Sequence, residues 1–320
     1  MMRESTTAED SFFRENQRVS SSEVLEALVS GCSVKLLRCA ISGDLDCNRL
    51  LRSEESFDLS AVRMTEEADQ HIVVFSQPVV FRECTFESDV CFGSPWETPG
   101  KLKIVFECDV VFNLSVFVGQ TRFSDAEFQG LAGFDGCTFQ RVTSFTGARF
   151  RGRAMFRTCS FEGYGLFSES RFFTDTRFTN TSFSKGVNFS GVRFDSRIDF
   201  GGVYSQRRSV PLYEGIVFGR KRFGDEESFW RFAKQTCQEA GHYQQAGECF
   251  YRERCASFWG RFRGSHYEQL TGSRKIRRCL VGIRLLPELI IGRWLFGYGE
   301  RPIRVLLAAL LIILSCGLYY

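Results

Sequence analysis

Phenylalanine recurs along the middle of the chain at a fixed spacing. From Phe106 to Phe200 a phenylalanine stands at every position reached by alternating steps of six and five residues, without one exception. The period is therefore about 11 residues, which matches neither the 3.6-residue period of a helix nor the two-residue period of a strand. A fixed period over so long a stretch indicates that each repeat is one structural unit and that the units stack.

The neighbours of these phenylalanines predict short strands. A small residue often stands two positions before the phenylalanine, and a polar residue or arginine mostly lies between them. That alternation is typical of a strand whose small and large side chains both face a core. Glycine, aspartate, serine and threonine between the pairs favour turns. Cys84, Cys137 and Cys159 occupy the small inward position, so we interpret them as core residues.

Two stretches carry a resemblance to a known family. They read Phe-Gln-Gly-Leu-Ala-Gly-Phe-Asp-Gly-Cys-Thr-Phe (128–139) and Phe-Thr-Gly-Ala-Arg-Phe-Arg-Gly-Arg-Ala-Met-Phe (145–156). The pattern resembles pentapeptide-repeat proteins of the phenylalanine-rich, 11-residue type. The resemblance implies a mostly β fold, a right-handed quadrilateral β-helix over 70–205 with 22 residues per turn. At roughly 4.8 Å per coil, about six coils give a rod on the order of 30 Å long. A bulge or a longer corner must absorb the six-residue step.

The N-terminal part predicts a tail and a cap. Residues 1–19 are polar and read as a flexible tail. Over 20–69 we expect a helix and a strand that cap the solenoid, because Ser20 and Glu23 form a capping-box signature before an apolar helical stripe. Within the array, the glycines and prolines of 93–103 predict a surface loop between coils.

The C-terminal part predicts helices. Residues 206–222 break the period and read as an exit loop. Apolar positions at helical spacing over 223–260 predict a helical hairpin that caps the far end of the solenoid. We interpret 261–300 as a basic juxtamembrane or interfacial segment. Residues 305–320 are free of charge, so 301–320 is expected to be a transmembrane helix.

Charge is unevenly distributed along the chain. Residues 1–70 carry 8 basic and 14 acidic side chains, residues 71–205 carry 14 of each, and residues 206–320 carry 19 basic and 10 acidic ones.

The polar first residues are not a secretory signal, and the 13 cysteines are therefore interpreted as reduced thiols. The prediction is a single-pass membrane protein with its repeats on the cytoplasmic side, whose basic, apolar tail contacts membrane lipids.

The sequence offers few candidates for chemistry. Cys237, His242, Cys249 and Cys255 cluster in the hairpin, but their spacing fits no zinc pattern, and small cysteines are common on buried helix faces. No nucleophile, phosphate-loop or paired-carboxylate motif is present. We therefore predict no enzyme activity, no catalytic, cofactor-binding or metal site, no cofactor and no small-molecule substrate.

The leading functional hypothesis is a non-enzymatic, membrane-anchored β-solenoid that acts as an interaction or structural scaffold, with a protein partner or self-association. Gly297–Gly299 reads Gly-Tyr-Gly before an apolar run, which resembles the junction in pentapeptide-repeat proteins with a two-span potassium-channel-like module. The alternative is therefore the cytosolic regulatory portion of such a protein, here truncated after the first span and without its pore.

A DNA mimic that binds topoisomerase is less favoured, because mimicry needs a negative face and the repeats are balanced in charge. No nucleic acid is expected as a partner.

Overall fold

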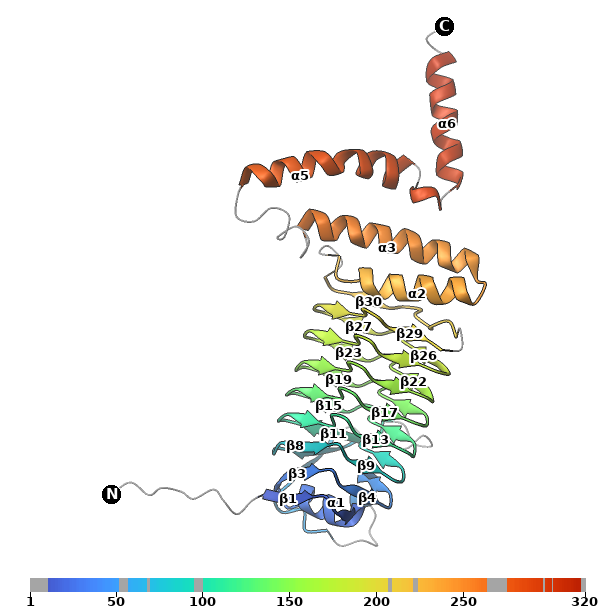
Figure 1. Ribbon diagram of the computed structural model, residues 1–320. Coiled ribbons are helices and arrows are strands. Elements are labelled where there is room, and N and C mark those ends of the chain that lie inside the picture. The colour runs from blue at the N-terminus through green and yellow to red at the C-terminus, as the bar shows by residue number, and fades with distance from the viewer. Residues whose placement is uncertain are drawn as a thin grey trace, which may run out of the picture. The chain divides into compact units, whose positions relative to one another are not determined.

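The computed structural model describes residues 11–51, 57–67, 70–94, 100–206, 209–220, 224–263, 275–295, 297–300 and 302–317. The chain divides into two compact units, Met1–Gly219 and Arg220–Tyr320. The first unit is almost entirely β-structure and the second is helical (Figure 1).

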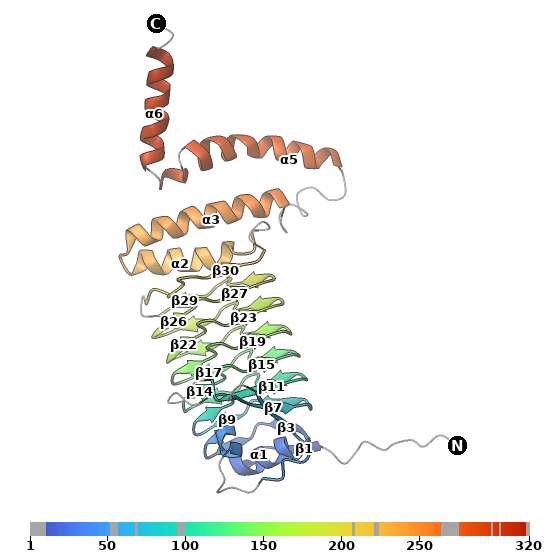
Figure 2. The ribbon, with the colours of Figure 1, turned by 180° about the vertical axis from the view of Figure 1, so that it is seen from behind.

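The first unit is a four-sided stack of coils. Four sheets run along it, and successive coils contribute one short strand to each (Figures 1 and 2). All strand pairs of these sheets are parallel except β6 with β7, which is antiparallel. The partner of each residue in the regular coils lies 22 positions away, as in Phe117 with Phe139 and Phe150 with Phe172. The predicted 22-residue turn and four-sided β-helix are confirmed.

The strands fall into the four sheets as follows. Sheet A contains β1 (Ser11–Glu15), β3 (Ser33–Leu37), β8 (Val79–Arg82), β12 (Val110–Val111), β16 (Ala132–Gly133), β20 (Ala154–Met155), β24 (Thr176–Arg177) and β28 (Ile198–Asp199). Sheet B contains β2 (Arg18–Ser20), β4 (Ala40–Ser42), β9 (Thr85–Phe86), β13 (Val116–Phe117), β17 (Thr138–Phe139), β21 (Ser160–Phe161), β25 (Ser182–Phe183) and β29 (Tyr204–Ser205). Sheet C contains β5 (Leu45–Asp46), β10 (Val90–Cys91), β14 (Thr121–Arg122), β18 (Thr143–Ser144), β22 (Tyr164–Leu166) and β26 (Gly186–Asn188). Sheet D contains β6 (Arg63–Glu67), β7 (Gln70–Phe75), β11 (Leu102–Phe106), β15 (Glu127–Phe128), β19 (Arg149–Phe150), β23 (Arg171–Phe172), β27 (Arg193–Phe194) and β30 (Val217–Phe218).

The periodic phenylalanines fill the core as four columns, one behind each sheet. Consecutive members of a column stack with nearly parallel rings, with centroids 4.8 Å apart for Phe117 and Phe139 and 5.1 Å apart for Phe134 and Phe156. Neighbouring columns meet edge to face, as in Phe145 with Phe156. Both arrangements are the favourable ones for aromatic rings. The core is therefore a regular lattice of phenylalanine rings.

The six- and five-residue steps belong to different corners of the coil. Most five-residue steps begin with a tight turn, in which the amide three positions after the phenylalanine bonds to its carbonyl; Ser115 N to Phe112 O is 3.2 Å. The third residue of that turn has a positive φ, as Leu114 (59°) and Gly136 (70°) do, which is the backbone pattern of a type II turn. Strands of successive coils pair residue by residue, with no extra residue in either strand. The sixth residue of the longer step therefore belongs to the corner between two strands and is not a bulge within one.

A positive φ is strained for a β-branched residue. Thr158 holds this turn position with a φ of 54°, at a cost of about 1–2 kcal/mol. We expect Thr158→Gly to raise the free energy of unfolding by about 0.5–1 kcal/mol, because the relief of strain exceeds the entropy that glycine loses. Urea denaturation measures this. Thr158→Ala, which keeps a Cβ in the strained conformation, should bring no gain; equal gains in both variants would contradict the explanation.

The solenoid begins earlier than the sequence indicated. Strands β1 and β2 pair with β3 and β4, which continue into the repeat sheets. The predicted tail over 1–19 is therefore strand from Ser11 on, and its first ten residues lie outside the described part. The cap predicted over 20–69 contains the expected helix, α1 (Ser21–Val29), where Ser20 Oγ accepts a bond of 3.2 Å from the Glu23 amide. A short 3-10 helix, η1 (Cys47–Leu51), follows β5.

The far end also extends past its predicted limit. The stretch 206–222, expected to be an exit loop, contributes β30 to sheet D through pairing with β27. Leu212 forms an isolated parallel bridge to Asn188. Residues 207–208 and 221–223 of this stretch lie outside the described residues.

The second unit contains the predicted helical hairpin. Helices α2 (Glu227–Glu239) and α3 (Tyr243–Arg263) pack against each other through buried residues such as Trp230, Phe232 and Phe258. Then follow α5 (Lys275–Pro287), the π-helix η3 (Glu288–Leu295), the short η4 (Gly297–Gly299) and α6 (Pro302–Gly317). Much of the basic segment predicted over 261–300 is thus helical, while 264–274 and residue 296 lie outside the described part.

The predicted transmembrane helix over 301–320 is wrong, and so is the single-pass membrane location that depended on it. Within the described residues, no helix combines enough length and apolar character to cross a bilayer. Helix α6 has 16 residues, which at 1.5 Å per residue span about 24 Å. The hydrocarbon core of a membrane is about 30 Å thick.

Candidate functional site

The cysteines of the repeats are packing residues. Cys84, Cys137 and Cys159 lie in the core of the first unit, as predicted, with almost no exposed surface. Burial raises the pKa of Cys84 to about 11 and that of Cys137 to about 12. These thiols stay protonated near neutral pH and are poor nucleophiles.

The hairpin brings two of the four candidate ligands together. Cys237 in α2 and Cys249 in α3 are both fully buried, and their thiols share a hydrogen bond that, with burial, raises the pKa of Cys237. Cys255 is half-buried and His242 is exposed. Across the described residues, no group of three or more histidines, cysteines and carboxylates is placed to hold a metal ion.

The Gly-Tyr-Gly segment is part of the packing of the second unit. Tyr298 has a φ of 56°, and its ring lies 6.2 Å from that of Tyr251 and 5.7 Å from the guanidinium of Arg254. Its hydroxyl donates to Glu288 Oε1 at 3.4 Å. Burial is the main cause that raises the pKa of Tyr298. Tyr298 therefore links η3 to α3 just before α6 begins. Nothing in this arrangement supports the resemblance to a potassium-channel-like module.

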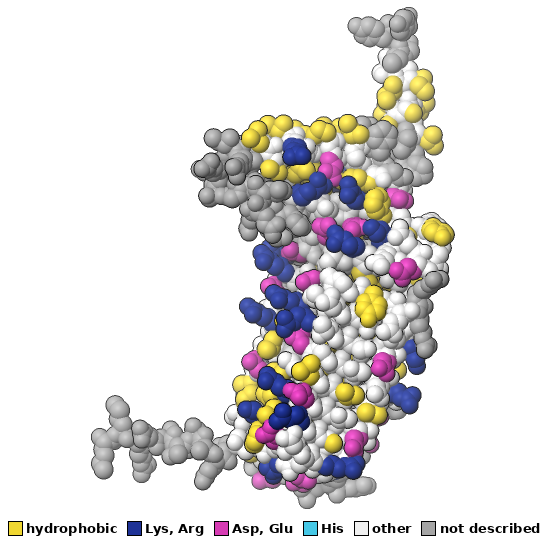
Figure 3. Space-filling view, in the orientation of Figure 1, with side chains coloured by type: hydrophobic (Ala, Val, Ile, Leu, Met, Phe, Trp, Pro, Cys, Tyr) yellow, Lys and Arg dark blue, Asp and Glu magenta, His cyan; other side chains and the backbone are white. Residues whose placement is uncertain are grey.

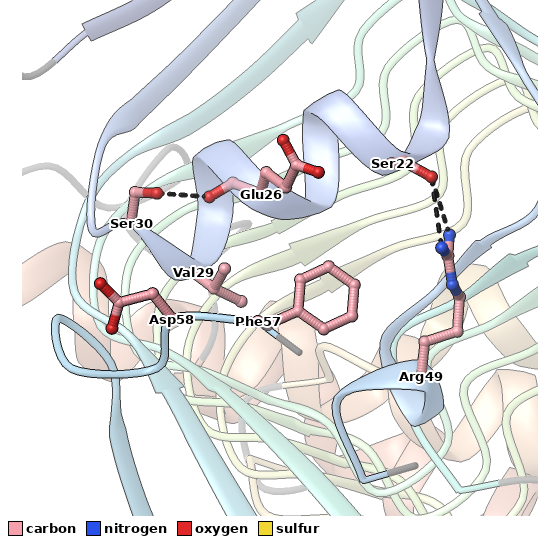
Figure 4. Close-up of a pocket in the computed structure, with 7 residues that line it drawn as sticks. All are labelled: Ser22, Glu26, Val29, Ser30, Arg49, Phe57 and Asp58. Atoms are coloured by element: carbon pink, nitrogen blue, oxygen red, sulfur yellow. Dashed lines mark hydrogen bonds between the residues drawn. The ribbon is translucent and has the colours of Figure 1, made fainter. Parts of the chain in front are cut away.

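A hollow of about 410 Å³ lies beside α1 at the N-terminal end of the first unit (Figure 4). Ser22, Glu26, Val29, Ser30, Arg49, Phe57 and Asp58 line it. The Arg49 guanidinium donates to Ser22 Oγ at 3.2 Å and lies 5.8 Å from the Phe57 ring centre, so its charge is already engaged. Hydrogen bonds from Ser60 lower the pKa of Asp58. The hollow contains no nucleophile beside a base, so its geometry supports no catalytic role.

The loop predicted over 93–103 ends earlier than expected, because Leu102 and Lys103 belong to β11. Ser94 Oγ bonds to both the amide and the carbonyl of Leu102 at 2.9 Å. Lys103 reaches the buried Glu127 at 2.8 Å, and Arg151 pairs with the same carboxylate. Burial by itself would raise the pKa of Glu127, but these two bonds lower it. Residues 95–99 lie outside the described part.

The most unusual surface is apolar and lies in the second unit. On α6 the described side chains from Leu306 to Leu314 are exposed except Ala308, and those exposed are apolar without exception. Figure 3 shows these apolar side chains, with more along α5 and η3. The exposed members there are Leu280, Ile283, Leu286, Ile290 and Ile291. Exposed apolar surface of this extent indicates an interaction site.

The comparisons with known proteins agree with the architecture of the first unit. Residues 123–171 match the family model described as pentapeptide repeats (9 copies). This stretch consists of pentapeptide repeats. No curated protein and no solved structure matches the chain. The pentapeptide-repeat match falls within the regular coils, where the periodic phenylalanines from Phe123 to Phe167 form the core.

Sequence reasoning missed a second surface, which lies on the pentapeptide-repeat coils. Arg149, Arg171 and Arg193 are register partners on sheet D and are all exposed. Their common spacing of 22 residues is present in the sequence. It becomes a signal only when the repeats are aligned by whole coils instead of by single 11-residue units.

Proposed function

We propose that this protein is a non-enzymatic scaffold that self-associates through α6. The repeat unit would serve as a rigid body that presents surfaces to partners, because its core is a continuous aromatic lattice. Pentapeptide-repeat proteins are typically structural or interaction scaffolds, in line with this role. The observation that carries the proposal is the exposed apolar surface of α6.

The pattern of α6 favours another helix as its partner. Ile303, Leu306, Leu310 and Ile313 follow one another at spacings of three, four and three residues, which is the a/d spacing of a coiled-coil seam. All four are exposed. Leu307 and Leu314 flank the seam and would widen it. A helix that is apolar on most sides is normally buried, and the same helix of a second copy supplies a matching apolar surface.

A lipid surface is the competing occupant. Arg252–Arg304 contains 12 basic and 4 acidic residues, a balance that suits anionic headgroups. A helix that lies on a bilayer surface needs a charged face for the headgroups, and α6 carries no charge from Val305 to Gly317, so self-association is the better explanation. No observation favours the role of a regulatory portion of a channel-like protein.

Light scattering after size exclusion tests the proposal with the intact chain. We expect a wild-type mass that is a multiple of the chain mass, and a monomer for Leu306→Glu/Leu310→Glu, because charge in the seam opposes helix pairing. Leu114→Glu places the same change at an exposed turn of the repeat rod and should leave the mass unchanged. A monomeric wild type overturns the proposal. So does a wild type that floats with phosphatidylserine vesicles and forms no oligomers without them.

A further inference from the structure

The first unit carries a regular group of arginines on the outside of sheet D. We define the arginine face as Arg149, Arg151, Arg171, Phe173 and Arg193. Arg149, Arg171 and Arg193 form one column along the stack, and Arg151 and Phe173 belong to the outward column two positions further on. Figure 3 shows Lys and Arg side chains gathered along this flank of the coils.

Two guanidinium groups of the arginine face, those of Arg151 and Arg171, are held by an aromatic ring. The Phe173 ring has two arginine neighbours, with Arg171 at 4.2 Å and Arg151 at 5.2 Å from its centre. Stacking of this kind fixes the plane of a guanidinium while its edge stays free for hydrogen bonds. Such preorganised arginines beside an aromatic side chain are the residue types that dominate binding energy at interfaces.

One carboxylate, that of Asp195, holds two arginines of the face and leaves part of each guanidinium free. Asp195 accepts bonds from Arg171 Nε at 2.8 Å and Arg193 Nε at 2.6 Å. Burial alone would raise the pKa of Asp195, but these bonds lower it, so it stays ionised. Because both bonds use Nε, the terminal nitrogens of the two arginines remain available to a partner. Arg149 makes no ion pair with any carboxylate in the described part of the chain. Burial raises the pKa of Asp125, and the charge of Arg149 opposes that shift.

The matching outward column on sheet B contains no arginine. The corresponding outward column there is Val116, Thr138, Ser160, Ser182 and Tyr204, none of which is charged. Sheet D therefore carries a column of arginines that has no counterpart in the matching column of sheet B. The overall charge balance of 14 basic against 14 acidic residues over 71–205 conceals this difference.

We propose that the arginine face binds an acidic α-helix of a partner protein, laid along the axis of the coils. Stacked strands place one arginine about every 4.8 Å. One face of a helix presents side chains at i, i+3 or i+4 and i+7, one per turn of about 5.4 Å. Glutamates at those positions can each meet one arginine of the column, while an apolar side chain beside them contacts Phe173.

The charges around the face favour a helix over nucleic acid. Asp195 lies on it and Asp175 follows β23 at its edge, and both are partly exposed. A nucleic acid presents phosphates at a regular spacing, and these carboxylates would repel them. A protein helix can place lysines opposite these aspartates, so mixed charge at the site selects a protein partner.

The binding test uses two synthetic helical peptides of about 20 residues. Both have the same composition, but one carries its glutamates on a single face and the other has them spread around the helix. Fluorescence anisotropy with the intact protein should show the one-faced peptide binding at least about fivefold more tightly, because only its carboxylates meet the column together.

Variants then locate the site. Arg149→Ala/Arg193→Ala should weaken binding of the one-faced peptide by about tenfold or more. Arg141→Ala removes an exposed arginine from a different corner of the coil and should leave binding unchanged; thermal melts verify that both variants fold. Equal affinity of the two peptides overturns the proposal. So does an equal effect of Arg141→Ala, or a single-stranded oligonucleotide of equal charge that binds more tightly with the same arginine dependence.

Discussion

We expect Phe156→Ala to lower the free energy of unfolding by about 3–5 kcal/mol, the range for removing a fully buried phenylalanine. Phe156 has no exposed surface. It stacks on Phe134 at 5.1 Å and on Phe178 at 4.9 Å, and it meets Phe145 and Phe167 edge to face. Its loss interrupts one column of rings and leaves a void. The strands of the coils above and below are held by their pairing, so they cannot move in to fill it. Chemical denaturation followed by circular dichroism measures the change.

Phe173→Ala is the matched control for this experiment. Phe173 stands outside the period, is half-buried and faces outward between arginines. We expect its removal to lower stability by about 1 kcal/mol or less, because little apolar surface is lost from the interior. Equal losses for the two variants would contradict the arrangement in which only the periodic phenylalanines build the core.

The second large effect is expected from Gly152→Ala. A Cβ at this position would lie 1.9 Å from the carbonyl oxygen of Gly130 in the coil below, and 2.3 Å from its carbonyl carbon. Both contacts are with backbone, so a side-chain rotation cannot relieve them. The coils would have to separate locally, and we expect a loss of about 3 kcal/mol or more, at or above the upper end of ordinary overpacking.

Gly133→Ala provides the comparison inside a strand, β16, of the coil below. There the nearest atom to a new Cβ is Asn113 Oδ1 at 3.2 Å, a side-chain atom that can shift, followed by methyl groups of Val111 at 3.6 Å. The change should alter the denaturation midpoint only slightly. A Gly152→Ala protein as stable as Gly133→Ala would show that the coils are further apart at this corner than the structure has them.

The phenylalanine pattern predicted stacked 11-residue units and the inward position of Cys137 and Cys159. The resemblance to pentapeptide repeats then implied that two such units make one four-sided coil, which the 22-residue register confirms. The first coils escaped this reasoning because other residues fill the same inward positions. There Val19, Val34, Leu36 and Ile41 are the buried side chains, and short runs of aliphatic residues do not distinguish a solenoid strand from a capping segment.

The errors at the C-terminal end have a different cause. The uncharged run from Val305 to Tyr320 was interpreted as a membrane span from its composition, but among the described residues no helix, α6 (Pro302–Gly317) included, is long and apolar enough to cross a bilayer. The arginine face could not be predicted either, since residues 22 positions apart become neighbours only when the coils stack. In both cases the deciding quantity is a three-dimensional length or distance, which residue types alone do not supply.

Sedimentation equilibrium of the intact wild-type chain over a range of concentrations tests the central functional proposal most directly. If α6 is an association helix, the average mass should rise with concentration toward a defined multiple of 36.6 kDa, and Leu306→Glu/Leu310→Glu should remain at the single-chain mass. A wild-type protein that sediments at 36.6 kDa at every concentration would contradict the account.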